Sequence, residues 1–262
     1  MRKLRFCLIG DGAIARYHKK AIEYVGGELS HVIDIVYETG IYLSKDDTTC
    51  SRSLEYTPVH DLEHIDFFVI STPSNLHREQ IKFILTHTHG SAQIICEKPA
   101  FLPWEPIIDN DRINIVLQLR YLPGLPKKAD LVKAVFVRDE NYFKTWKGDA
   151  RKTGGIFANL FIHYIDLAIQ LGADFEGMVK AEGEQDRHVL YTRKNHDGTS
   201  VMFLDQDSYQ ACYNRLYENI VSGGGIKPKD LFYLSWILWR NSELFGFGRN
   251  GMNKLIRIGK EL

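Results

Sequence analysis

The sequence has 262 residues, of which 44% are apolar and 25% are charged. These shares are typical of a globular protein and exclude a fibrous or disordered chain, and the length suits two modest domains. Lysine plus arginine and aspartate plus glutamate each number 33, so the formal net charge is zero. That balance argues against nucleic acid or an anionic membrane as the main partner, since both bind clustered positive charge.

Several features indicate a cytoplasmic protein. No apolar run approaches the roughly 18–20 residues that cross a bilayer, and Met1-Arg2-Lys3 leads into a short strand rather than a secretory segment. The ten histidines form no set with acidic or cysteine ligands, so no metal site is expected. We expect reduced thiols at the four cysteines, which are too widely spaced for a C-x-x-C pair: Cys7, Cys50, Cys96 and Cys212.

The first hundred residues alternate short apolar runs with helical patterns, which predicts a parallel sheet covered by helices. The expected strands are residues 4–9, 31–36, 67–70, 93–96 and 114–119, and the expected helices are 13–25 and 76–85. A full helix is doubtful just before the last of these strands, because Pro103 and Pro106 interrupt that segment.

From Tyr121 the pattern changes, and Pro123, Gly124 and Pro126 mark a domain boundary. We therefore expect one domain over residues 1–120 and a second over 121–262. In the second domain the pattern predicts a strand at 133–137, a long helix at 155–171, a hairpin at 186–204, and helices at 208–221 and 229–245.

A glycine-rich turn, Gly10-Asp11-Gly12-Ala13-Ile14-Ala15, links the first expected strand to the first expected helix. The first glycine permits a tight turn, the second lets the backbone approach a pyrophosphate, and the helix N-terminus offers N–H groups to the phosphates. Asp34 ends the second expected strand, where a carboxylate binds a ribose diol and repels a 2′-phosphate. The pattern predicts binding of NAD rather than NADP; the alternative is a glycine-rich turn with an incidental aspartate.

Two further loops follow strands of the same expected sheet: Ser71-Thr72-Pro73 with Asn75 and His77, and Glu97-Lys98-Pro99. Ligands of open α/β sheets bind outside the carboxyl ends of the strands, so both loops are expected to face a cofactor. A lysine there favours the deprotonated form of a substrate hydroxyl. The alternatives are an ordinary helix cap in the first loop and a surface ion pair in the second.

The long helix of the second domain carries Asn159, His163 and Asp166 at i, i+4 and i+7, on one face. Histidine suits the abstraction of a hydroxyl proton near neutral pH, and a neighbouring amide or carboxylate can orient it. The alternative is a core histidine with satisfied hydrogen bonds.

These motifs, in this order and over nearly the whole chain, resemble the glucose–fructose oxidoreductase/inositol dehydrogenase (Gfo/Idh/MocA) family. More narrowly, residues 115–120 and 142–152, with Trp146-Lys147-Gly148-Asp149, resemble the UDP-N-acetyl-2-amino-2-deoxyglucuronate 3-dehydrogenases of surface-polysaccharide (O-antigen) synthesis. The resemblance implies an α/β fold, with an N-terminal Rossmann domain whose doubly wound sheet is mostly parallel. It further implies an α+β C-terminal domain whose open, mostly antiparallel sheet mediates a homo-oligomer, a dimer or a tetramer. The implied reaction oxidises the C3 hydroxyl of a nucleotide sugar, with NAD as hydride acceptor.

The resemblance also implies a role for each motif residue. Lys98 contacts the reacting hydroxyl, His163 is the general base, and Asn159 completes the catalytic set. The implied cofactor-binding residues are Gly10, Gly12, Ala13, Ile14, Asp34, Ser71, Thr72, Pro73, Asn75, His77, Glu97 and Lys98. The implied substrate-binding residues are Arg120, Tyr142, Lys144, Trp146, Lys147, Arg151, Asn159 and His163. The basic and aromatic residues among them suit a pyrophosphate, a uronic carboxylate or a stacked base.

Two other functions compete with this interpretation: a dehydrogenase of another sugar or a cyclitol, and a non-catalytic NAD-binding sensor of the same fold. The chain departs from the family pattern in three shortened segments, 37–58, 100–113 and 173–205. These departures put the oligomer interface and the nucleotide pocket in question more than the redox chemistry.

Overall fold

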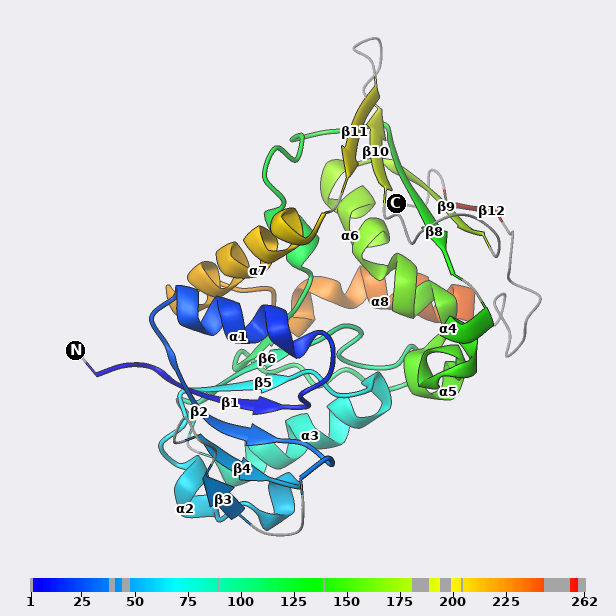
Figure 1. The fold of residues 1–262 in the computed structure, drawn as a ribbon. Helices are drawn as coiled ribbons and strands as arrows, with labels where there is room; N and C mark the ends of the chain where they lie inside the picture. The colour runs from blue at the N-terminus through cyan, green and yellow to red at the C-terminus, as the bar shows by residue number, and fades with distance from the viewer. Residues whose placement is uncertain are drawn as a thin grey trace. The chain divides into compact units, whose positions relative to one another are not determined.

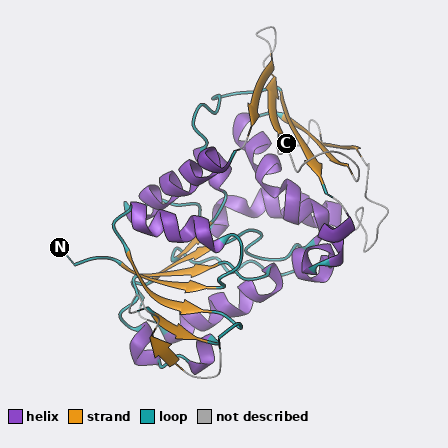
Figure 2. Ribbon diagram, in the orientation of Figure 1, coloured by secondary structure: helices purple, strands orange, loops and turns teal. Residues whose placement is uncertain are grey.

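The computed structural model describes residues 2–37, 41–43, 48–88, 90–138, 140–180, 189–193, 199–203, 205–242 and 255–258. The chain divides into two compact units, each with its own sheet (Figures 1 and 2). Unit 1 comprises Met1–Phe101, Pro106–Val116 and Tyr213–Asp230, and unit 2 comprises Leu102–Glu105, Leu117–Cys212 and Leu231–Leu262. This division differs from the expected ranges 1–120 and 121–262, chiefly because residues 213–230 return to unit 1.

Unit 1 is built on a seven-stranded sheet in the order β3-β4-β2-β1-β5-β6-β7. Its strands are β1 (Arg5–Ile9), β2 (Glu28–Ile33), β3 (Ile41–Leu43), β4 (Thr49–Ser51), β5 (Phe67–Ile70), β6 (Gln93–Cys96) and β7 (Ile113–Ile115). All neighbouring pairs are parallel except β3 with β4. Apart from the added β3, this is the strand order of a Rossmann fold, with its switch point beside β1, and the predicted doubly wound sheet is confirmed.

Helices cover both faces of this sheet: α1 (Ala15–Tyr24), α2 (Val59–Leu62), α3 (Ser74–His87) and the second half of α7 (Gln206–Val221). The connections from β1 to β2 and from β5 to β6 run in opposite directions along the sheet. Because such connections are right-handed, α1 and α3 must lie on opposite faces, as Figure 1 shows. The His18 ring of α1 lies 2.8 Å from the Tyr217 hydroxyl of α7, which places the second half of α7 on the α1 face.

Two expected strands have other bounds than predicted. The strand expected at 31–36 is β2, which begins three residues earlier and ends at Ile33, because the Asp34 carboxylate accepts the N–H of Val36 and turns the chain away from the sheet. The strand expected at 114–119 is limited to β7, and a 3₁₀ turn occupies Gln118–Tyr121.

Unit 2 contains a five-stranded sheet in the order β11-β10-β8-β9-β12. Its strands are β8 (Leu131–Val137), β9 (Asp174–Lys180), β10 (Val189–Arg193), β11 (Thr199–Phe203) and β12 (Leu255–Ile258). All pairs are antiparallel except β8 with β9, so the predicted mostly antiparallel sheet is confirmed. β10 and β11 form the predicted hairpin, whose turn at 194–198 lies outside the described residues.

The helices of unit 2 are α4 (Glu140–Lys144), α5 (Ala150–Thr153), α6 (Ile162–Leu171) and α8 (Phe232–Ser242), with the first half of α7. Phe161 makes edge-to-face contacts with Phe136 of β8 and Phe175 of β9, which hold the start of α6 against the sheet. The helix predicted over 155–171 is modified by a π-helical segment at Phe157–Phe161. The stretch Ala150–Leu171 is long and apolar enough to cross a bilayer, but 78% of its most apolar window is buried in the protein, as expected for a core helix.

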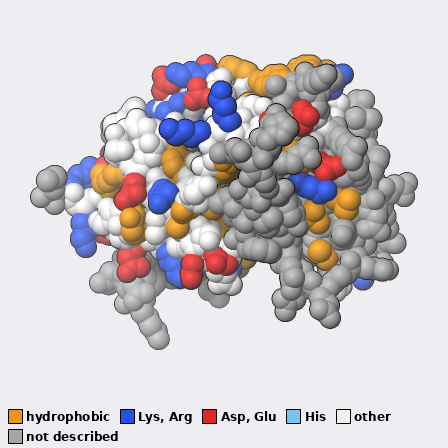
Figure 3. All heavy atoms as spheres, turned by 90° about the horizontal axis from the view of Figure 1, so that it is seen from above, with side chains coloured by type: hydrophobic (Ala, Val, Ile, Leu, Met, Phe, Trp, Pro, Cys, Tyr) orange, Lys and Arg blue, Asp and Glu red, His pale blue; other side chains and the backbone are white. Residues whose placement is uncertain are grey.

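On the face shown in Figure 3, the Lys and Arg side chains of the described residues are interspersed with Asp and Glu. This distribution agrees with the zero net charge of the sequence.

Candidate active site

The glycine-rich turn is fixed by contacts at the carboxyl ends of three neighbouring strands. Gly10 has φ +93°, and a Cβ atom there would lie 2.9 Å from backbone atoms of Ser71 and Thr72. The Gly10 N–H donates to the carbonyl of Ile33 (2.8 Å), and the Ser71 hydroxyl donates to the carbonyl of Gly10 (2.6 Å). The turn after β1 is therefore held by both β2 and the loop after β5, and only glycine fits position 10.

The rest of this turn is open and fits a dinucleotide. Gly12 is exposed, and a Cβ atom there would meet nothing within 4 Å, so packing within the chain does not require a glycine at this position. Helix α1 begins at Ala15, its cap residue Ile14 makes no side-chain cap hydrogen bond, and its first turn holds no acidic residue. Open space beside the backbone and an uncapped helix N-terminus are what a pyrophosphate requires.

Asp34 follows β2 directly, at the predicted ribose position. Its Oδ2 accepts the N–H of Asp11 (2.5 Å) and its Oδ1 accepts the N–H of Val36 (2.9 Å). Each carboxylate oxygen can accept a second hydrogen bond, so the partly exposed carboxylate is oriented by the backbone and still able to bind a diol.

The residues predicted in the loop after β5 have two different environments: some could contact a ligand, and others hold the loop in place. Pro73 precedes α3 without capping it, and the Asn75 Oδ1 is buried with no hydrogen-bond partner in the part of the chain that is described. His77 is fully buried, and its ring nitrogens lie 2.8 Å from the carbonyl of Thr72 and 2.9 Å from that of Pro99. His77 therefore links the loops after β5 and β6, while Asn75 offers the free polar atom.

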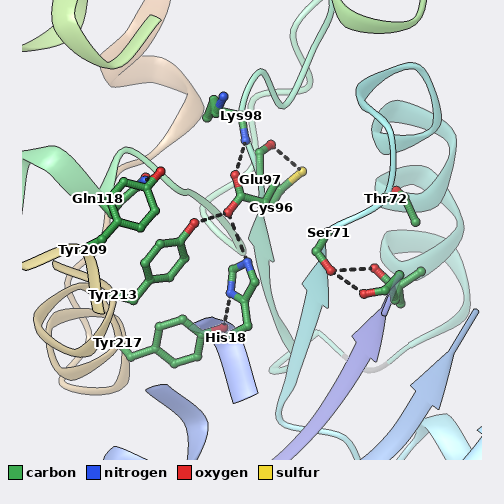
Figure 4. Close-up of polar contacts among 12 residues, drawn as sticks. His18, Ser71, Thr72, Cys96, Glu97, Lys98, Gln118, Tyr209, Tyr213 and Tyr217 are labelled. Atoms are coloured by element: carbon green, nitrogen blue, oxygen red, sulfur yellow. Dashed lines mark hydrogen bonds and ion pairs between the residues drawn. The ribbon is translucent and has the colours of Figure 1, made fainter. Parts of the chain in front are cut away.

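Glu97 follows β6, and its side chain turns into unit 1 rather than toward solvent (Figure 4). It is 6% exposed, and its Oε1 accepts from the Tyr213 hydroxyl (2.6 Å) and lies 3.1 Å from the His18 Nε2. The other ring nitrogen of His18 lies 2.8 Å from the Tyr217 hydroxyl. The next residue in the chain is Lys98, whose N–H donates to the Glu97 Oε2 (3.2 Å).

The charge of this buried carboxylate is stabilised by its neighbours. Burial by itself would raise the pKa of Glu97, but the interaction with His18 and the charge of Lys98 outweigh it and hold the pKa at about 2. Burial, with Glu97 nearby, raises the pKa of the Tyr217 hydroxyl well above its usual value, so Tyr217 stays protonated. The group formed by His18, Glu97, Tyr213 and Tyr217 thus anchors the backbone that carries Lys98.

In unit 2, Arg120 and Asp166 form a bidentate ion pair, with Nε to Oδ2 at 2.7 Å and Nη2 to Oδ1 at 2.5 Å. Burial raises the pKa of Asp166, which is 1% exposed, while Arg120 acts in the opposite direction. The guanidinium predicted to bind substrate is therefore engaged in joining the 3₁₀ turn after β7 to α6.

Tyr142 is the centre of a second cluster in unit 2. Its hydroxyl accepts from the Asn159 Nδ2 (3.0 Å), and the Lys147 ammonium lies 5.4 Å from the centre of its ring. Arg138, which belongs to none of the sequence motifs, lies with its guanidinium 5.0 Å from the same ring centre. Burial raises the pKa of the Tyr142 hydroxyl, and Arg138 and Asn159 lower it in part.

The other predicted substrate residues are distributed along the surface. Lys144 is exposed, Trp146 is 38% exposed, and the exposed Arg151 forms an ion pair with Asp149 at 3.2 Å. Of the expected basic and aromatic cluster, Lys147 lies over the ring of Tyr142. His163 lies in the first turn of α6, four residues after Asn159, and its side chain is buried.

The sequence contained signals for the residues that were missed. His18 lies three residues after the glycine-rich turn, and its partners Tyr213 and Tyr217 are one helical turn apart on α7. Arg138 continues the alternation of β8, whose buried residues are Val132, Ala134 and Phe136. A charged residue at the next position of a buried stripe is a recognisable signal of function. The described residues contain no group of three His, Cys, Asp or Glu arranged to hold a metal ion.

Comparison with known proteins agrees with this geometry. Residues 4–113 match the model of the Gfo/Idh/MocA family, described as an oxidoreductase family with an NAD-binding Rossmann fold. The match assigns this part of the chain, residues 4–113, to the NAD-binding domain of the Gfo/Idh/MocA oxidoreductases. The match spans the glycine turn and the loops after β5 and β6, and NAD is the cofactor.

Solved structures of similar fold include three dehydrogenases. The WlbA (WbpB) dehydrogenase from Thermus thermophilus, in complex with NAD and α-ketoglutarate, is 20% identical over 95% of this chain and 99% of that one, with a TM-score of 0.71. WlbA from Bordetella pertussis, in complex with NADH and UDP-GlcNAcA, is 17% identical over 98% of both chains, with a TM-score of 0.59. Myo-inositol 2-dehydrogenase from Lactobacillus plantarum is 13% identical over 98% of this chain and 100% of that one, with a TM-score of 0.65.

Alanine at the two glycines of the turn is expected to have opposite effects. Gly10→Ala places a Cβ against the backbone of Ser71 at a positive φ, so it should lower the free energy of unfolding by about 1–3 kcal/mol. Gly12→Ala meets open space, so stability should change by less than about 0.5 kcal/mol while NAD binding weakens at least ~10-fold. Urea unfolding and calorimetric titration with NAD measure both; unchanged NAD affinity in Gly12→Ala would contradict the assignment of the cradle.

The Glu97 carboxylate makes stability depend on pH. Its pKa is about 2 in the folded protein, against an ordinary 4.5, so its contribution is fully present above pH 4.5 and is lost as pH falls toward 2. Glu97→Gln should therefore lower the free energy of unfolding by about 3 kcal/mol at neutral pH, with the difference from wild type shrinking as pH falls. Urea unfolding from about pH 6 to about pH 3 tests this. The matched control is Glu79→Gln, which alters an exposed carboxylate on α3 and should change stability little at any pH in this range; a constant difference for Glu97→Gln would refute the prediction.

Proposed function

We propose that this chain is an NAD-dependent dehydrogenase that oxidises a hydroxyl of a nucleotide sugar, namely C3 of UDP-N-acetylglucosaminuronate. The observation that carries the proposal is the position of Lys98. β1, β5 and β6 are consecutive strands of the sheet, and the glycine turn, the Ser71 loop and Lys98 follow their carboxyl ends. A lysine beside a dinucleotide cradle is suited to act on a group that reacts with the cofactor.

The buried anchor next to Lys98 supports this role. When bound, NAD supplies a hydride acceptor. The Glu97 side chain is held by His18 and Tyr213, so the adjacent backbone of Lys98 has little freedom. Its ammonium group would donate a hydrogen bond to the reacting hydroxyl and stabilise the negative charge that develops on that oxygen.

We assign the removal of the hydroxyl proton to His163 in unit 2. A neutral imidazole accepts a proton near neutral pH, and the side chain is buried in the first turn of α6. Asn159, four residues earlier, is held by the Tyr142 hydroxyl and would position the sugar beside His163.

The choice of nucleotide sugar rests on resemblance. Residues 142–152 resemble the UDP-N-acetyl-2-amino-2-deoxyglucuronate 3-dehydrogenases, and the similar WlbA structure was solved with UDP-GlcNAcA. The similar fold of a myo-inositol dehydrogenase makes cyclitols the second substrate class to assay. We further propose a cytoplasmic homo-oligomer, a dimer or a tetramer, that contributes to surface-polysaccharide synthesis.

Substitution of the two proposed catalytic residues tests the reaction. Lys98→Met and His163→Ala should each lower kcat by about 10²–10⁴-fold with UDP-N-acetylglucosaminuronate, because each removes a group that acts on the hydroxyl. NADH absorbance measures the rate. The control His64→Ala, an exposed histidine of unit 1, should stay within about twofold. NAD binding without NADH formation from any sugar or cyclitol would support the sensor instead.

Asp34 should determine cofactor choice. Asp34→Asn keeps a hydrogen-bond acceptor for the turn and removes the charge that repels a 2′-phosphate. We expect the ratio of kcat/KM for NAD to that for NADP to fall by about 10–100-fold, since a hydrogen bond to a charged group contributes about 1.5–3 kcal/mol. An unchanged ratio would place the ribose elsewhere; urea unfolding confirms that the turn still folds.

A further inference from the structure

Arg138 places a positive charge on the inner face of the unit 2 sheet. It follows β8 directly, in phase with the buried residues Val132, Ala134 and Phe136, and is 8% exposed. Its Nη1 donates to the carbonyl of Val137 (2.9 Å), and its guanidinium lies 5.2 Å from the centre of the Phe136 ring. The side chain is thus held in one orientation by packing, as a binding residue needs to be.

A second cation approaches the same aromatic ring. The guanidinium of Arg138 and the ammonium of Lys147 lie 5.0 Å and 5.4 Å from the centre of the Tyr142 ring. Burial of the ammonium group, and then the nearby Arg138, lower the pKa of Lys147, so the two charges repel each other. An anion bound beside them would relieve that repulsion.

The position along the chain connects these cations with the proposed chemistry. The Tyr142 hydroxyl is hydrogen-bonded to Asn159 at 3.0 Å, and Asn159 lies four residues before His163. A group bound by Arg138 would therefore belong to the part of a substrate that lies close to the reacting hydroxyl. In a nucleotide sugar whose ring is oxidised at C3, the carboxylate on that ring is one covalent bond nearer to this hydroxyl than the first phosphate is.

We propose that Arg138, with Lys147, binds the carboxylate of a uronic acid sugar and so makes the site selective for acidic over neutral sugars. This inference rests on the proposed function and extends it to a residue that sequence reasoning did not find. The planar guanidinium matches a carboxylate in bidentate geometry, and lysine adds a second charge without fixed geometry.

Ligand binding tests this without requiring turnover. Protein saturated with NADH is titrated by calorimetry with UDP-N-acetylglucosaminuronate and with the neutral UDP-N-acetylglucosamine. For Arg138→Gln we expect about 10–100-fold weaker binding of the acidic sugar, and a change of less than about threefold for the neutral one. Arg138→Lys should recover part of the affinity, because it restores the charge without the fork.

Two further variants guard against misfolding and general charge effects. Lys147→Gln alters an exposed side chain and should weaken only the acidic sugar, by about 3–10-fold. Lys128→Gln removes an exposed lysine of unit 2 outside the cluster and should change neither affinity. Equal weakening of both sugars by Arg138→Gln would assign the cations to the diphosphate and overturn the proposal, as would no weakening at all.

The outcomes separate this inference from the proposed function. Selective binding of the acidic sugar without NADH formation would refute the dehydrogenase and leave the carboxylate site intact. If the wild-type protein binds neither nucleotide sugar, D-glucuronate and D-glucose are titrated instead. Binding of glucuronate alone, lost in Arg138→Gln, would support the carboxylate site, and absence of that binding would overturn it.

Discussion

The contact between Gly10 and the loop after β5 is the constraint on which the candidate cofactor site depends. The backbones approach so closely that a Cβ atom at Gly10 would lie 2.9 Å from Ser71 and Thr72. The same turn is hydrogen-bonded to the end of β2 through Ile33. Because three strand ends are joined at one point, Asp34 and the open Gly12 turn have a fixed geometry before any ligand binds.

A buried charge extends this order to the next strand of the sheet. Glu97 is ionised in a nearly dry environment, which is favourable only because His18 and Tyr213 supply hydrogen bonds. Tyr213 and Tyr217 lie more than a hundred positions after Glu97 in the sequence. They belong to a segment that returns to unit 1 after most of unit 2. The same contacts that stabilise the buried Glu97 carboxylate also fix the position of the adjacent backbone of Lys98.

Unit 2 also contains a buried charged side chain that is held by its neighbours, and there the charge is positive. Arg138 lies in the buried stripe of β8, against the rings of Phe136 and Tyr142. The π-helical segment before α6 places Asn159 where it can reach the Tyr142 hydroxyl. Polar groups inserted into an apolar sheet–helix interface are costly unless each is held by a partner. Their presence is consistent with the proposed binding site.

The sequence by itself predicted the parallel sheet of unit 1, because strand runs, turn glycines and helical periods are local signals. The mostly antiparallel sheet of unit 2 was implied by the resemblance to a known family. The sequence also determined that the Gly10 turn, the Ser71 loop and Lys98 follow strands of one sheet, and the structure confirms that β1, β5 and β6 are neighbours. Only the tertiary structure decided which polar residues pair. It joined Arg120 to Asp166 and Glu97 to His18 and Tyr213. Such pairs connect residues distant in the chain, and sequence periodicity carries no information on long-range contacts.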